Sequence, residues 1–135
     1  MAEIVLTDAH VEIGSLDVSD HVRSLTISYK AEAPEKTAMG DTAKTRLGGL
    51  LDWSLDVELN QDYADASIDS VLFDLVGTSV ALIMRPTSDP VGAANPEFTG
   101  DGIFTDYDPI AGKVGDVAIT KLKFVGNGVL ERAVA

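Results

Sequence analysis

The sequence predicts a mainly β fold with one helix, and three observations support this. Apolar and polar residues alternate in most segments, which is the period of a strand with one buried face. Glycines separate these segments in the second half of the chain, at positions suited to turns. Only the segment 65–77 repeats its apolar residues at the spacing of a helix.

Three strands are expected in the first half of the chain. Residues 4–13 alternate loosely and are followed by a turn at Gly14-Ser15, and residues 23–29 alternate cleanly. In residues 53–60 every second side chain is apolar. That strand begins with Trp53, the only tryptophan, which we expect to anchor the core.

The helical segment is expected to form three turns. Asp65 suits its N-cap, Asp69 suits the positive end of the helix dipole, and Gly77 suits its C-terminal cap. Phe73 lies off the apolar stripe, and a partly covered surface aromatic and a subunit contact explain it equally well. The stripe itself consists of Ile68, Val71, Leu72, Leu75 and Val76.

The second half of the chain predicts four more strands. Residues 79–85 form a continuous apolar run, and residues 98–107 and 117–125 follow as further strands. Residues 129–134 predict a short final strand. The proline-rich segment 85–96 is expected to be an exposed connection.

A long polar, glycine-bearing connection joins the second and third strands, at about residues 32–51. A compact domain rarely carries a structureless connection of this length unless it has a function. The sequence therefore predicts a loop that is either disordered or ordered by something outside the monomer.

Charge is the strongest feature of the composition. The 135 residues fit one domain, 1–135, with 22 acids, 10 bases and a net charge of −12. Seven acids and no base lie between Arg46 and Arg85. Conventional DNA binding needs basic groups that neutralise phosphates, so the composition argues against that function.

No arrangement of residues predicts an enzyme, a metal site or a cofactor. The chain has no cysteine and two histidines. Asp8, His10 and Glu12 alternate along one strand face, but steps of about 7 Å are too long for shared ligation, so we expect a polar solvent face. The acids at 101, 106 and 108 lack the spacing of a calcium loop, and nucleophile-elbow, P-loop and dinucleotide motifs are missing.

The N-terminus shows no basic segment followed by an apolar run, and no stretch approaches the roughly 18–20 apolar residues of a membrane span. We therefore expect a protein made in the cytoplasm, without membrane insertion.

Four segments carry a family resemblance in their order along the chain. They are VEIGSLDVSDHVRSLTISY, TAMGDTAKTRLGGLLDWSLDVEL, SIDSVLFDLVGTSVALIMRPTS and NPEFTGDGIFTDYDPIAGKVGD. Together they resemble the tail tube (major tail) proteins of long-tailed, non-contractile bacteriophages, and are most similar to the small versions from actinobacterial phages. The resemblance spans about residues 3–133.

The resemblance implies two packed antiparallel sheets, a β-sandwich or barrel-like fold, with one flanking α-helix. It also implies hexameric rings that stack into a tube around a lumen, with the long loop reaching into the adjacent ring. The implied partners are further copies of the chain, a tape-measure protein, tail terminator and tail-tip proteins, and DNA that passes without sequence-specific binding. The implied location is the virion tail.

Two residue sets are the candidate sites. The assembly loop combines apolar anchors with charged groups that suit docking on an acidic neighbour: Lys36, Met39, Asp41, Lys44, Arg46, Leu47, Leu50 and Leu51. The candidate lumen acids, which offer passing DNA no counterion-release affinity, are Asp56, Glu58, Asp101, Asp106 and Asp108. The alternatives are a monomeric β-sandwich module that binds carbohydrate or a surface partner, and a hydrolase that uses surface carboxylates.

Overall fold

The computed structural model describes residues 5–64 and 67–134. In these residues, eight strands, one short α-helix and two 3₁₀ turns follow each other. In order they are β1 (His10–Ile13), β2 (Leu16–Asp17), η1 (Ser19–His21), β3 (Val22–Ala31), β4 (Leu51–Asn60), α1 (Ile68–Leu72), η2 (Phe73–Leu75), β5 (Ser79–Arg85), β6 (Glu97–Tyr107), β7 (Ile119–Gly126) and β8 (Glu131–Ala133).

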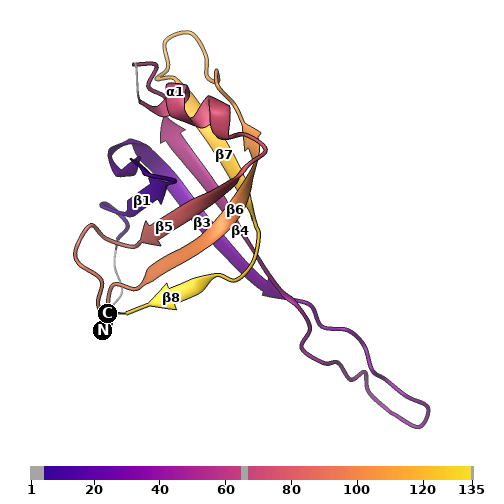
Figure 1. Ribbon diagram of the computed structural model, residues 1–135. Coiled ribbons are helices and arrows are strands. Elements are labelled where there is room, and N and C mark those ends of the chain that lie inside the picture. Colours follow the sequence, from indigo (N-terminus) through magenta and orange to yellow (C-terminus); the bar gives the residue numbers. More distant parts are fainter. Residues whose placement is uncertain (1–4, 65–66, 135) are drawn as a thin grey trace.

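All eight strands belong to one antiparallel sheet, in the order β2-β1-β5-β6-β7-β4-β3, and β8 pairs with β6. The sheet curves so that β5 crosses in front of β3 and β4, and α1 lies at one end (Figure 1). The predicted mainly β fold with one flanking helix is confirmed. The strands share one sheet rather than two because β6 pairs with β5 along its first part and with β7 along its second.

The core lies inside this curve. The inward side chains of β4 (Trp53, Leu55, Val57 and Leu59) are all buried, as the alternation predicted. Phe104 of β6 and Phe124 of β7 stack at the centre, with ring centroids 4.6 Å apart. Trp53 is 2% exposed and is the predicted core anchor.

The first strand is shorter than predicted. Residues 5–9 lie outside any strand, and β1 begins at His10, opposite Arg85 of β5. Pro86 follows Arg85, and proline has no N–H to donate to a neighbouring strand. The partner strand thus ends there. The other six predicted strands lie within two residues of their observed bounds.

The helix is also shorter than predicted. After Leu72 the chain tightens into η2, and Val76 is already extended. The N–H of Gly77 donates to the Phe104 carbonyl at 2.8 Å, which draws the backbone into the sheet. Gly77 has φ 86, as expected for a C-terminal cap, and the N-cap is Ser67; Asp65 lies outside the described residues.

Candidate assembly interface

The connection between β3 and β4 forms an arm, residues 32–50, which extends far from the sheet (Figure 1). Its two branches continue the β3–β4 pairing. The N–H of Gly49 donates to the Glu32 carbonyl at 2.7 Å, and that of Leu47 donates to Pro34 at 2.9 Å. The sequence predicted that this loop is either disordered or ordered by something outside the monomer. That prediction is wrong, because hydrogen bonds between the two branches hold the arm in one conformation.

A tight turn closes the tip of the arm. Asp41 accepts the N–H of Ala38 at 2.8 Å through Oδ2, and its own N–H donates to the Ala38 carbonyl at 3.1 Å. Gly40 between them has φ 97, a conformation that favours glycine. Asp41 therefore stabilises the turn. The sequence predicted Asp41 only as one of the residues of the assembly loop.

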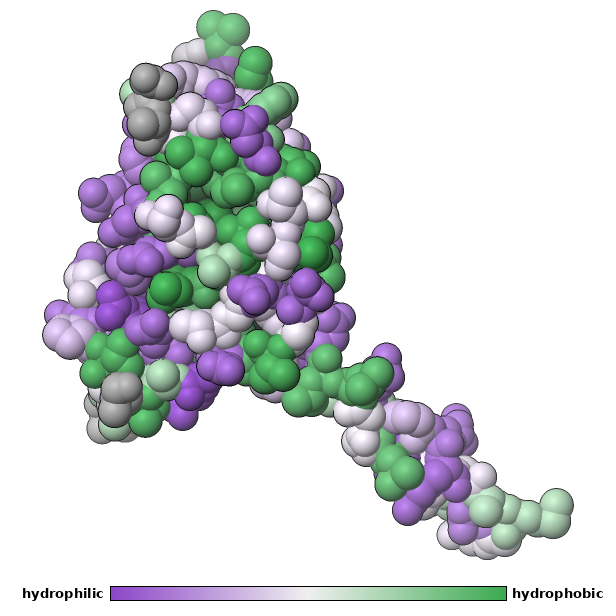
Figure 2. Space-filling model, viewed as in Figure 1, coloured by the Kyte–Doolittle hydropathy of each residue, from purple (hydrophilic) through white to green (hydrophobic). Residues whose placement is uncertain are grey.

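Every side chain of the arm is exposed. Met39 at the tip is fully exposed, and Leu50 at the base is 77% exposed. Lys36, Lys44 and Arg46 are exposed as well. Figure 2 shows hydrophobic residues gathered where the arm leaves the body. Exposed apolar groups in this number mark an interaction surface.

The outward face of the sheet carries two cross-strand rows of charge. Lys123 of β7 lies opposite Asp56 of β4 and Asp106 of β6. Lys121 lies opposite Glu58, and its carbonyl accepts the N–H of Asp108 at 3.3 Å. Each row therefore alternates carboxylate, ammonium and carboxylate. The Lys123 row retains one negative charge, whereas Arg23 adds a second positive charge beside Glu58 in the Lys121 row.

These rows form the floor of a groove of about 840 Å³. Asp56 and Glu58 lie on its β4 side, where Arg23 is 4.0 Å from Glu58. Asp106 and Asp108 lie on its β6 side, together with the exposed Phe73 and Val76. Four of the five candidate lumen acids thus lie together, and Asp101 lies apart, in the part of β6 that pairs with Ala81 of β5.

A hydrogen-bonded cluster holds the β6 side of the groove in place. The Tyr107 hydroxyl donates to Asp69 of α1 at 2.6 Å, and Gln61 donates to that hydroxyl at 3.1 Å. Gln61 and Tyr63 both donate to the Pro109 carbonyl, at 2.9 and 2.7 Å. Burial and the bond to Asp69 raise the pKa of Tyr107 to about 12, so its hydroxyl stays protonated and remains a donor.

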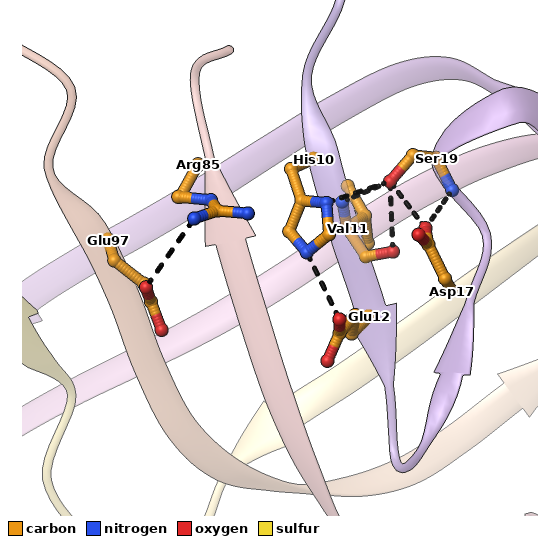
Figure 3. A network of polar contacts seen from close by, with 7 residues as sticks. All are labelled: His10, Val11, Glu12, Asp17, Ser19, Arg85 and Glu97. Carbon is orange, nitrogen blue, oxygen red and sulfur yellow. Dashed lines mark hydrogen bonds and ion pairs between the residues drawn. The ribbon is translucent and has the colours of Figure 1, made fainter. Parts of the chain in front are cut away.

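The histidine singled out in the sequence belongs to a polar network (Figure 3). His10 contacts Glu12 at 3.2 Å and Ser19 at 3.4 Å, and its side chain is largely covered, so the predicted solvent face is wrong for His10. The Ser19 hydroxyl is 2.6 Å from Asp17, to which it donates, and it accepts the N–H of Val11.

This network is suited to structure rather than to nucleophilic catalysis. A serine nucleophile donates its proton to histidine, whereas the Ser19 proton points to a carboxylate. The bond from Ser19 lowers the pKa of Asp17, which keeps that carboxylate ionised as an acceptor. Ser19 thereby ties η1 to β1.

Within residues 5–64 and 67–134, no group of three or more acidic or histidine side chains is arranged to hold a metal ion. In the same residues, no helix has the length and hydrophobicity needed to cross a membrane.

The fold resembles solved tail structures. No protein-family model and no curated protein matches the sequence. A chain of the native gene transfer agent virion matches with a TM-score of 0.71 and 19% identity over 93% of this chain and 95% of that one. A chain from the C6-symmetric tail of an empty gene transfer agent particle matches with a TM-score of 0.66 and 20% identity. The match covers 84% of this chain and 82% of that one.

Two further structures come from adsorption and baseplate assemblies. The Dit hub protein of phage SPP1 matches with a TM-score of 0.55 and 15% identity, over 90% of this chain and 50% of that one. A chain of the anti-feeding prophage baseplate matches with a TM-score of 0.57 and 14% identity. The match covers 98% of this chain and 97% of that one. The chain therefore has the fold of phage and gene transfer agent tail and baseplate proteins.

The site contains residues that were not predicted from sequence, among them Lys121, Lys123 and Val76. Phe73, for which a subunit contact was one of two interpretations, lines the same groove. The alternation of Lys121 and Lys123 with Leu122 and Phe124 signals an outward face. The acids that lie beside Lys121 and Lys123 are set by strand pairing, and the alternation within one strand does not predict that pairing.

Proposed function

We propose that this chain is the structural subunit of a phage tail tube, which assembles as hexameric rings stacked around an acidic lumen for genome passage. The observation that carries the proposal is the arm. It is ordered by its own hydrogen bonds, yet no side chain between residues 32 and 50 is buried. Its exposed apolar groups need a surface to cover them, and another copy of the chain supplies one.

The similar structures support this reading, since two of them are parts of a gene transfer agent particle and one is a tail with C6 symmetry. The sequence pattern adds the narrower assignment to the non-contractile, actinobacterial-phage type. It also adds the partners that follow from the assignment: a tape-measure protein, a terminator, tail-tip proteins and transient DNA. The location that follows is the virion tail.

The acidic lumen rests on charge and exposure. Asp56 and Glu58 lie on the outward face of β4, beside the outward Ser24 and Thr26 of β3. A polar surface with excess carboxylates offers DNA no counterion-release affinity. Screening over about 8 Å at physiological salt limits the repulsion to the wall itself.

Negative-stain electron microscopy of the concentrated, purified protein tests the proposal, with light scattering alongside. We expect rings or hollow tubes. A variant in which a short turn replaces residues 33–49 should fold, because the arm contributes no buried residue, but should not stack.

The same pair of proteins tests the alternative of a monomeric binding module. A protein that stays monomeric at every concentration, with and without the arm, would contradict the tube and favour that module.

A further inference from the structure

The arm leaves β4 at the first residue of that strand, and the groove lies along the other half of the strand. β4 begins at Leu51, at the base of the arm, and ends at Asn60, directly before the segment whose Gln61 and Tyr63 support the groove (Figure 1). Asp56 and Glu58, which line the groove, are five and seven residues after Leu51, or roughly 17–24 Å along an extended strand. Because the arm also points away from the body, it meets a groove only on a second copy.

The return branch of the arm, residues 42–50, is basic and apolar. Its only charged residues are Lys44 and Arg46, and it ends in the exposed Leu50. Residues two apart in an extended branch point to the same side, about 7 Å from each other. Glu35 of the outgoing branch lies opposite Arg46, so the positive charge is greatest at Lys44.

The groove matches this branch in charge and spacing. Its two rows are also two residues apart along β7, at Lys123 and Lys121. The Lys123 row retains one negative charge, and in the Lys121 row Arg23 lies 4.0 Å from Glu58, on the side away from Asp108. On the β6 side the rows end in Asp106 and Asp108, both exposed. Phe73, which is 64% exposed, lines the groove on the same side.

We propose that the return branch of one copy's arm occupies the β6 side of the groove of a second copy. Lys44 and Arg46 lie against Asp106 and Asp108, and Leu50, which points to the same side of the branch, packs on Phe73. This inference rests on the proposed tail-tube function and gives Asp106 and Asp108 a different task from Asp56 and Glu58. The first pair binds a neighbour, and the second pair faces the lumen.

Such a contact is heterologous, because the donor and acceptor surfaces differ. Every copy offers one arm and one groove, so the contact propagates from copy to copy instead of closing a dimer. Rings that exchange arms in this way stack in one direction, with all arms pointing along the tube.

Reciprocal charge reversal tests the contact in the full chain. The variant K44E/R46E and the variant D106K/D108K should each lower the assembled fraction by about tenfold, because like charges then face each other. The quadruple variant has the wild-type net charge with the pairing inverted, and it should assemble to within about twofold of wild type. Sedimentation and electron microscopy measure assembly, and circular dichroism checks folding.

A matched control has the same net charge without the complementary pairing. In K44E/R46E/D89K/E131K the new lysines lie at exposed positions outside the groove, and assembly should stay low. Equal rescue by this control, or full assembly by both double variants, would overturn the docking inference and leave the tube standing.

A second measurement uses the absence of cysteine in the chain. M39C alone should give at most disulfide-linked dimers. L50C/F73C should give a ladder of covalent oligomers, whereas L50C/S88C should not. A wild-type protein that never assembles would contradict the proposed function and, with it, this inference. Assembly without the L50C/F73C ladder would contradict the docking inference alone.

Discussion

Glycine at two positions lets the Trp53 indole pack into the core. An added Cβ at Gly126 would lie 2.5 Å from the Trp53 Nε1, and one at Gly100 would lie 2.7 Å from Cζ2. Neither glycine has positive φ, so the requirement is space rather than backbone conformation. The two glycines come from β7 and β6, on strands that the chain reaches well after Trp53.

We predict that Gly126→Ala lowers the free energy of unfolding by about 1–3 kcal/mol, the usual cost of overpacking a core. Denaturant unfolding followed by the fluorescence of Trp53 measures this. Gly48→Ala is the control, since an added Cβ there meets no atom within 4 Å, and it should stay within about 0.5 kcal/mol of wild type. Equal stability of both variants would mean that the indole does not lie against Gly126.

The raised pKa of Tyr107 predicts that the stability of the fold depends on pH in alkaline solution. Its pKa is raised from 10.0 to about 12 by burial and by Asp69, so the unfolded chain ionises first as pH rises. Ionisation then favours the unfolded state, and this contribution to stability is present below pH 10 and is lost by about pH 12.

Tyr107→Phe removes that contribution. Its unfolding midpoint in urea, compared with wild type from pH 9 to pH 12, should show a stability difference that shrinks as pH rises. At neutral pH the variant should lose about 1–2 kcal/mol with the hydrogen bond to Asp69. Tyr29→Phe removes an exposed hydroxyl on β3 and is the control, which should show the same dependence of stability on pH as the wild type. A stability difference between Tyr107→Phe and wild type that stays constant from pH 9 to pH 12 would contradict the link to Tyr107.

At the scale of elements, α1 and η2 present two faces to different surroundings. Ile68 and Leu72 are fully covered by the core, whereas Phe73 faces the groove. The helix thus closes one end of the curved sheet and also supplies part of the candidate interface.

We predict that Leu72→Ala costs about 2–5 kcal/mol in the free energy of unfolding, because it leaves a cavity at a buried site. Phe73→Ala should change that free energy by no more than about 0.5 kcal/mol. Thermal or denaturant unfolding followed by circular dichroism compares the two. Similar losses in both variants would mean that Phe73 belongs to the core.

The two paired branches of the arm were not predicted from the sequence. Its length and composition marked it as functional, but nothing in the segment alternates strictly enough to predict two paired branches. The pairing arises because β3 and β4 already lie in register, with Ala31 opposite Leu51, so the adjoining residues continue the ladder. An antiparallel pair can extend at small cost once its register is set.

At the scale of the whole molecule, charge is divided unevenly. The arm from 32 to 50 holds three acids and three bases, so the rest of the chain carries the full −12. The repulsion among copies of the body is strong, and contacts between copies need either apolar surface or a local basic group. The arm supplies both.

The proposed lumen predicts how assembled tubes treat DNA. Asp56→Lys with Glu58→Lys raises the formal net charge of each subunit from −12 to −8. We expect variant tubes to retain duplex DNA in a salt-dependent manner in co-sedimentation, while wild-type tubes retain none. Asp89→Lys with Glu131→Lys gives the same net charge at other exposed positions. Equal retention by both pairs would remove Asp56 and Glu58 from the lumen wall.

The sequence by itself determined the face on which most side chains lie. Alternation placed the apolar side chains of β4 inward and Asp56 and Glu58 outward, and it predicted the mainly β class. The spacing of apolar residues in 65–77 predicted the helix. These are local properties, since the pleat of a strand assigns successive residues to opposite faces without reference to any other strand.

Only the tertiary structure decided which outward residues become neighbours. The pairing of β7 with both β4 and β6 puts Lys121 and Lys123 between acids more than 40 positions apart in the chain, and the end of β6 brings Phe73 to the same groove. Pairing and register follow from the summed burial of whole strands, so a short segment does not contain them. For that reason the acids were visible in the sequence, whereas the groove that they form with the lysines and the helix was not.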